Sequence, residues 1–124
     1  MLSSMVYQKI YECLAAFLPD SWEKLVVCLE YGEAAYTFSF YVKVDGKFIK
    51  CYDLPGLDEE QLYNAYREID RLVEHERNAL SGEKWTVMTM VVDAEGNMHS
   101  DYDYTDLSGG TYEYRKMWKR RYLR

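Results

Sequence analysis

Residues 85–107 (WTVMTMVVDAEGNMHSDYDYTDL) constrain the fold of this chain more than any other segment. The first part, 85–92, is apolar at both alternate sets of positions, a pattern typical of a strand that is covered on both faces. Residues 93–97 predict a turn, in which Gly96 can adopt a positive φ. A second strand follows at 98–104. The segment therefore predicts a hairpin whose first strand lies in the middle of a sheet.

The other elements follow from hydrophobic periodicity and from Gly and Pro breaks. We predict a helix over 3–18 ended by Pro19, strands over 25–31, 36–44 and 47–52 with a turn at 32–34, a helix of about 22 residues between caps at Asp58 and Gly82, and a basic C-terminal helix or tail within 110–124. The order helix, three strands, helix, two strands, helix predicts an α+β fold. We expect one domain spanning 1–124, with a largely antiparallel sheet packed by helices.

Two local signals define element ends, and a third assigns a buried face. Asp45-Gly46 predicts a type I′ hairpin turn, which requires positive φ at both residues. Asp58 and Gln61 have the spacing of a capping box at a helix start. In strand 36–44 the aromatic and apolar residues alternate with polar ones, which predicts one buried face.

The charge is distributed unevenly along the chain. The net charge of the 124 residues is −6, but residues 1–110 carry 9 Lys and Arg against 20 Asp and Glu, or −11, while 111–124 carry 6 against 1, or +5. An acidic body argues against direct binding of nucleic acid and favours a basic partner.

Three further features concern compartment and cofactors. The three cysteines are odd in number and show no CxxC spacing, which predicts free thiols rather than a disulfide framework or a zinc site. No apolar run is long enough to span a membrane. The N-terminus lacks the pattern of a signal peptide. We therefore expect a cytoplasmic protein with no membrane association.

The candidate functional residues are Asp101, Tyr102, Asp103 and Tyr104, followed by Asp106. Alternation in a strand places Asp101 and Asp103 on one face, about 6.6–7 Å apart. Such a row can be a solvated, charged edge strand, a surface for a basic partner, or a carboxylate pair that holds a metal or acts as acid and base.

The C-terminal segment EYRKMWKRRYLR interleaves basic and aromatic residues. Its Trp118 and Tyr122 are four residues apart and can dock together on the acidic body. The alternative is binding of single-stranded nucleic acid.

Recognised catalytic and metal-binding motifs are absent from the sequence. His75 lacks a second ligand at helical spacing, and His99 stands alone on a strand. We therefore expect no catalytic residue, no metal and no cofactor.

Several stretches in order resemble the YezG-type immunity proteins. They are Trp22-Glu23-Lys24, Leu29 to Glu33, Phe38 to Val42, Trp85-Thr86, Asp101 to Tyr104 with Asp106-Leu107-Ser108, and Trp118-Lys119 with Tyr122-Leu123. The resemblance implies a cytoplasmic, non-enzymatic antitoxin. Such a protein binds and occludes a secreted polymorphic toxin of a type VII-like system, often a nuclease.

On this interpretation a basic nuclease domain is the partner in a heteromeric complex, and self-association remains possible. The expected partner contacts are Asp101, Tyr102, Asp103, Tyr104, Asp106 and Trp118, the aromatic ones if they are exposed. Two alternatives stay open. One is a small metal- or ligand-dependent enzyme that uses Asp101 and Asp103, and the other is an adaptor whose basic tail binds RNA.

Overall fold

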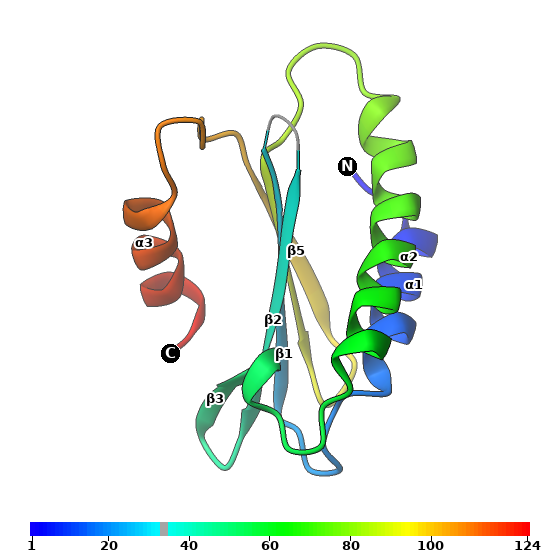
Figure 1. The fold of residues 1–124 in the computed structure, drawn as a ribbon, viewed down its shortest axis with the longest axis vertical. Coiled ribbons are helices and arrows are strands. Elements are labelled where there is room, and N and C mark those ends of the chain that lie inside the picture. Colours follow the sequence, from blue (N-terminus) through cyan, green and yellow to red (C-terminus); the bar gives the residue numbers. More distant parts are fainter. Residues whose placement is uncertain (33–34) are drawn as a thin grey trace.

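The computed structural model describes residues 1–32 and 35–124, which form one five-stranded antiparallel sheet and three α-helices (Figure 1). The elements are α1 (Ser4–Ala15), β1 (Lys24–Tyr31), β2 (Tyr36–Val44), β3 (Lys47–Lys50), η1 (Cys51–Asp53), α2 (Glu59–Asn78), β4 (Val87–Asp93), β5 (Met98–Asp103) and α3 (Tyr112–Tyr122). The strand order is β3-β2-β1-β4-β5. The predicted α+β class and element order are confirmed.

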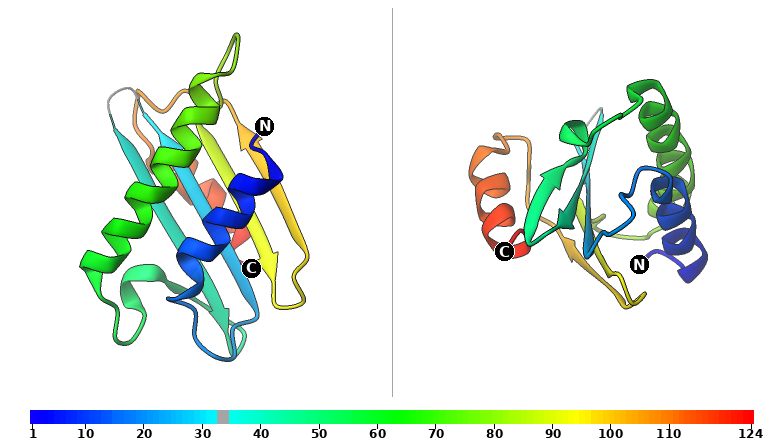
Figure 2. Two further views of the ribbon diagram at one scale, coloured as in Figure 1. Left: turned by 90° about the vertical axis from the view of Figure 1, so that its right-hand side faces the viewer. Right: turned by 90° about the horizontal axis from the view of Figure 1, so that it is seen from below.

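The sheet separates two unequal helical layers. Helices α1 and α2 cover one face, and α3 lies alone on the opposite face (Figures 1 and 2). The larger core lies under α1 and α2 and includes Ile10, Phe40 and Ile69, all fully buried. A smaller core lies under α3 and contains Val26, Cys28, Tyr41, Val87, Val91 and Trp118.

The innermost strand is β1, which pairs with β2 on one side and β4 on the other. Its residues 25–31 are all buried, because both faces are covered where the two cores overlap. Strand β4 also lies inside the sheet, between β1 and β5, as its apolar pattern predicts. Strand β2 differs from the expectation of one buried face: Phe40 faces the larger core, but Tyr41 is buried under α3. A third helix on the far side of the sheet accounts for the difference.

Helix α1 begins as predicted and ends earlier. The Ser3 hydroxyl accepts a hydrogen bond from the Val6 N–H at 3.3 Å, which caps the helix. The helix ends at Ala15 instead of 18, because Phe17 and Leu18 donate to carbonyls three residues back and form a tight turn before Pro19.

Helix α2 is likewise shorter than predicted. Asp58 Oδ1 accepts hydrogen bonds from the N–H groups of Glu60 (3.0 Å) and Gln61 (3.2 Å), which confirms Asp58 as the N-cap. The helix ends at Asn78 and not next to Gly82, which has a positive φ in the loop that follows. A helix can end at an ordinary residue when the chain must turn back to the sheet.

Turn chemistry decides the remaining ends. Asp45 and Gly46 have φ values of 50° and 76°, which confirms the predicted turn between β2 and β3. Strand β3 stops at Lys50, two residues before its predicted end, and η1 follows. Gly96 has the expected positive φ. The predicted turn at 32–34 lies partly outside the described residues.

Candidate partner-binding surface

Strand β5 distributes the candidate residues over both faces of the sheet. Asp101 and Asp103 point toward α3, whereas Tyr102 packs against the larger core beside α1. The alternation predicted from sequence is therefore present. However, α3 overlies the carboxylate row, so the row is half-buried instead of fully solvated.

Asp101 binds the C-terminal helix directly. The Tyr122 hydroxyl donates to Asp101 Oδ2 at 2.6 Å, and Arg121 Nη2 lies 3.9 Å from the same oxygen. Burial, together with this hydrogen bond, raises the pKa of Tyr122 to about 12. Asp101 thus helps to fix α3 on the sheet.

Asp103 is engaged by the residues that follow it. Its Oδ1 accepts hydrogen bonds from the Thr105 N–H (3.0 Å) and the Thr105 hydroxyl (2.6 Å). Burial by itself raises the pKa of Asp103, but the hydrogen bonds from Thr105, with a further one from Tyr114, outweigh it and hold the pKa below its ordinary value. Asp103 is therefore a stably ionised carboxylate.

A pH prediction follows from Asp103. A carboxylate whose pKa is lower in the folded than in the unfolded state stabilises the fold above the unfolded pKa of about 3.9, and that contribution is lost as the pH falls through the folded pKa. We expect Asp103→Asn to lose less stability than the parent chain between pH 7 and pH 3 in urea unfolding. Asp20→Asn, an equal charge change at an exposed position, should lose as much stability over this pH range as the parent chain. The same loss in Asp103→Asn as in the parent would contradict a lowered pKa of Asp103 in the folded state.

Trp118 holds α3 against the sheet. Only 4% of the side chain is exposed, and its indole N–H donates to the Thr89 hydroxyl at 2.8 Å. Its ring packs against Tyr41 and Tyr122, at centroid distances of 5.7 and 5.3 Å. The C-terminal segment therefore docks on the acidic body. Direct partner contact by Trp118 was expected only if its side chain is exposed, and this side chain is buried.

One ion pair under α3 was not predicted from the sequence. Arg115 donates two hydrogen bonds to Glu30, at 3.0 and 3.1 Å, and Glu30 is buried in the middle of the sheet. A lone carboxylate in the apolar strand LVVCLEY is a usable signal for such a pair, because a buried charge requires a partner.

Tyr102 lies on the opposite face in a hydroxyl network. Its hydroxyl accepts the Leu2 N–H at 2.8 Å and shares a short hydrogen bond with the Tyr7 hydroxyl, which also binds the Ser100 hydroxyl at 2.8 Å. This network joins α1 and the N-terminus to β5. Tyr102 is thus half-buried and structurally engaged.

Tyr104 and Asp106 are the exposed members of the candidate set. The Tyr104 side chain is 51% exposed, and Asp106 is exposed with its carboxylate accepting the Ser108 N–H at 2.9 Å. Both lie in the segment that joins β5 to α3. An aromatic ring and a carboxylate are therefore accessible here without displacement of α3.

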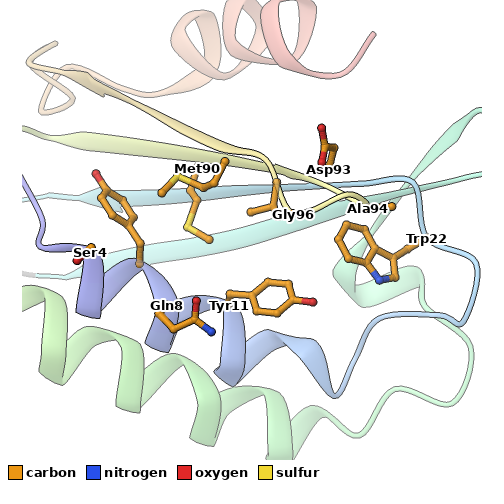
Figure 3. A pocket seen from close by; sticks show the side chains of 11 residues that line it. Ser4, Gln8, Tyr11, Trp22, Met90, Asp93, Ala94 and Gly96 are labelled. Carbon is orange, nitrogen blue, oxygen red and sulfur yellow. The ribbon is translucent and has the colours of Figure 1, made fainter.

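A groove that the sequence analysis did not anticipate runs between α1 and the β4–β5 hairpin (Figure 3). Its volume is about 390 Å³. It is lined by Ser4, Tyr7, Gln8, Tyr11, Trp22, Met90, Val92, Asp93, Ala94, Gly96 and Met98. The lining is mostly apolar and aromatic, which is typical of a site that receives an apolar group.

Within residues 1–32 and 35–124 no group of three or more His, Cys, Asp or Glu is placed to hold a metal ion. In the same part of the chain, no helix is both long and apolar enough to cross a membrane.

Comparison with known proteins gives one family. The family described as "Immunity protein YezG-like" matches residues 2–124. The protein named "Immunity protein YezG" of Bacillus spizizenii is 25% identical over 114 residues, which cover 82% of this chain and 68% of the relative. The protein of the same name from Bacillus subtilis is 26% identical over 112 residues, which cover 82% and 73% of the two chains.

Proposed function

The chain belongs to the YezG-like immunity proteins, and we propose that it is a cytoplasmic, non-enzymatic antitoxin that binds and occludes a secreted polymorphic toxin, a nuclease domain. The observation that carries the proposal is the family match over residues 2–124. The curated relatives that are similar over most of their length are named immunity proteins.

Charge supports a basic partner. Residues 85–114 contain six carboxylates and no Lys or Arg. Nuclease domains use basic grooves to bind phosphates, and an acidic surface can occupy such a groove and speed association. Five of the six basic residues of 111–124 lie on α3, on the far side of the sheet from α1 and α2 (Figure 1), and Arg124 follows this helix.

Among the expected contact residues, we assign direct contact to Tyr104, Asp106 and the exposed portions of Asp101 and Asp103. Tyr104 is a rigid ring with a polar tip, which suits a protein interface. Tyr102 and Trp118 take part by holding β5 and α3 in place.

The enzyme alternative receives less support from the geometry. The cavity next to Asp101 and Asp103 has a volume of about 110 Å³ and lies beneath α3. The lowered pKa of Asp103 suits an ion-pairing carboxylate and not a proton donor at neutral pH.

The test uses the tagged full-length chain in lysate of its native host. We expect it to co-purify with one near-stoichiometric, basic, secreted-toxin-like chain. The catalytic domain of that chain is then expressed in a heterologous bacterium, where it should degrade nucleic acid and kill the cells unless this chain is co-expressed. Death of the co-expressing cells would overturn the antitoxin assignment, and intact nucleic acid in dying cells would overturn the nuclease assignment.

Two charge reversals test the surface. Asp106→Lys should slow association by roughly three- to tenfold, because it replaces attraction by repulsion at the interface. Glu59→Lys changes the net charge equally at the start of α2, at the opposite end of the structure (Figure 1), and should have a smaller effect. Equal rates for the two variants would count against contact at Asp106.

A further inference from the structure

Strand β5 has an open outer edge. It is the last strand of the sheet within the described residues. Antiparallel neighbours alternate between pairs that exchange both backbone hydrogen bonds and pairs that exchange none. The Asp93 N–H donates to the Asn97 carbonyl at 3.0 Å, so Asp93 and Asn97 form a hydrogen-bonded pair. Because the two kinds of pair alternate along the strands, Met98, Ser100 and Tyr102 occupy non-bonded positions opposite β4. The backbone N–H and C=O groups of Met98, Ser100 and Tyr102 therefore point away from β4.

The apolar groove lies next to this edge. Met98 lines the groove, and its side chain is 42% exposed at the start of β5. Figure 3 shows Tyr11 and Trp22 on the same groove, opposite the β4–β5 hairpin. If another strand pairs with the outer edge of β5, every second side chain of that strand lies on this face, next to the groove.

The other face of the same edge is acidic. Asp101 and Asp103 point to the α3 side, and residues 85–114 supply no Lys or Arg to neutralise them. The basic groups near Asp101 come from α3, where Arg121 lies 3.9 Å away and is itself mostly exposed. The Asp101 side chain is still 42% exposed beside Tyr122 and Arg121, so part of its carboxylate remains open to a basic partner.

We propose that an extended segment of the toxin adds to the sheet as a further strand beside β5. This inference rests on the proposed function, because it takes the toxin as the partner. Successive side chains of a strand point to opposite faces, so a segment with alternating apolar and basic residues fits both sides. Its apolar residues enter the groove, and its Lys or Arg residues meet Asp101 and Asp103. Main-chain hydrogen bonds to Met98, Ser100 and Tyr102 supply the docking register.

A second copy of this chain fits the edge less well. Two β5 strands paired around a two-fold axis would place Asp101 and Asp103 of both copies on the same face of the joined sheet. Like charges on neighbouring strands are destabilising. Charge complementarity therefore favours a basic, heterologous strand.

The main test compares Ser100→Pro with Ser100→Ala. Proline removes the outward N–H of residue 100 and spares the hydrogen bonds to β4. Alanine removes only the hydroxyl that binds Tyr7. With the toxin domain recovered by co-purification as the probe, Ser100→Pro should bind at least about tenfold more weakly than Ser100→Ala, a change that corresponds to loss of a main-chain contact at the interface. Equal dissociation constants, with both variants folded by circular dichroism, would overturn the inference.

Two measurements do not depend on the proline variant. Hydrogen exchange in the unmodified chain should slow at the amides of Met98, Ser100 and Tyr102 when the toxin domain binds, and unchanged exchange there would overturn the inference.

Gln8→Trp, which fills the groove, should weaken binding, whereas Gln61→Trp, the same substitution at an exposed position of α2, should not. Equal binding by these two variants would overturn the groove contact.

The outcomes separate this inference from the proposed function. If the unmodified chain does not bind or neutralise the toxin domain, the proposed function fails and the inference fails with it. If it neutralises the toxin while β5 stays unprotected, only the inference fails. A dimer of the free chain joined through protected β5 amides would also overturn it, in favour of pairing between copies.

Discussion

Replacing Trp118 by alanine is expected to lower the free energy of unfolding by about 3–4 kcal/mol, within the range for truncating a buried aromatic residue. The change removes the hydrogen bond to Thr89 and leaves a cavity beside Tyr41 in the smaller core. Helix α3 has only 11 residues, too few for a stable helix in isolation, so its helicity depends on docking. Urea unfolding followed by circular dichroism measures the loss.

Hydrogen exchange locates the same effect. In Trp118→Ala the amides of α3 should exchange through local opening, while those of β1 stay protected. Met117→Ala is the matched control, since the neighbouring Met117 side chain is 49% exposed and its truncation should change stability by less than about 0.5 kcal/mol. Equal losses for the two variants would show that α3 is not held by Trp118.

The second large effect is expected at Trp85, which lies two residues before β4 and is 1% exposed. Its ring packs edge-on against Tyr31 and Tyr102, with both centroids 5.5 Å away, and the Arg77 guanidinium lies 5.3 Å from the ring. Trp85→Ala should therefore cost about 3–5 kcal/mol. Chemical denaturation gives the value directly.

Trp85→Phe should be far milder, at about 1–2 kcal/mol. The Trp85 indole N–H is buried and has no hydrogen-bond partner among the described residues. Phenylalanine removes this desolvated donor, which offsets part of the lost packing. A loss as large as that of Trp85→Ala would mean that the indole N–H is paired in solution.

The apolar patterns predicted most of the fold. Alternation in 36–44 gave the bounds of β2, and the two-sided apolar pattern of 85–92 placed β4 inside the sheet. Such patterns are reliable because burial acts on each residue of an element separately. Helix ends were less predictable, as α1 and α2 show, because the last turn depends on where the chain must go next.

The candidate surface was only partly predictable. The faces of β5 followed from alternation, so Asp101 and Asp103 were correctly placed together. The sequence indicated that the C-terminal segment can dock on the acidic body, but not that α3 would overlie these two carboxylates, nor that Trp22 and Met98 would line a groove. These contacts join residues far apart in the chain, and no local pattern encodes their distance.

By itself, the sequence determined the α+β class, the hairpin of 85–107, the cap at Asp58 and the excess of negative charge before residue 111. Each of these depends on a residue's own chemistry or on neighbours within one turn or strand. The tertiary structure alone decided which carboxylates are neutralised internally and which edge and groove remain open. The physical reason is that burial and charge pairing depend on packing across the whole sheet, where α3 covers one face and α1 leaves the outer side of β5 uncovered.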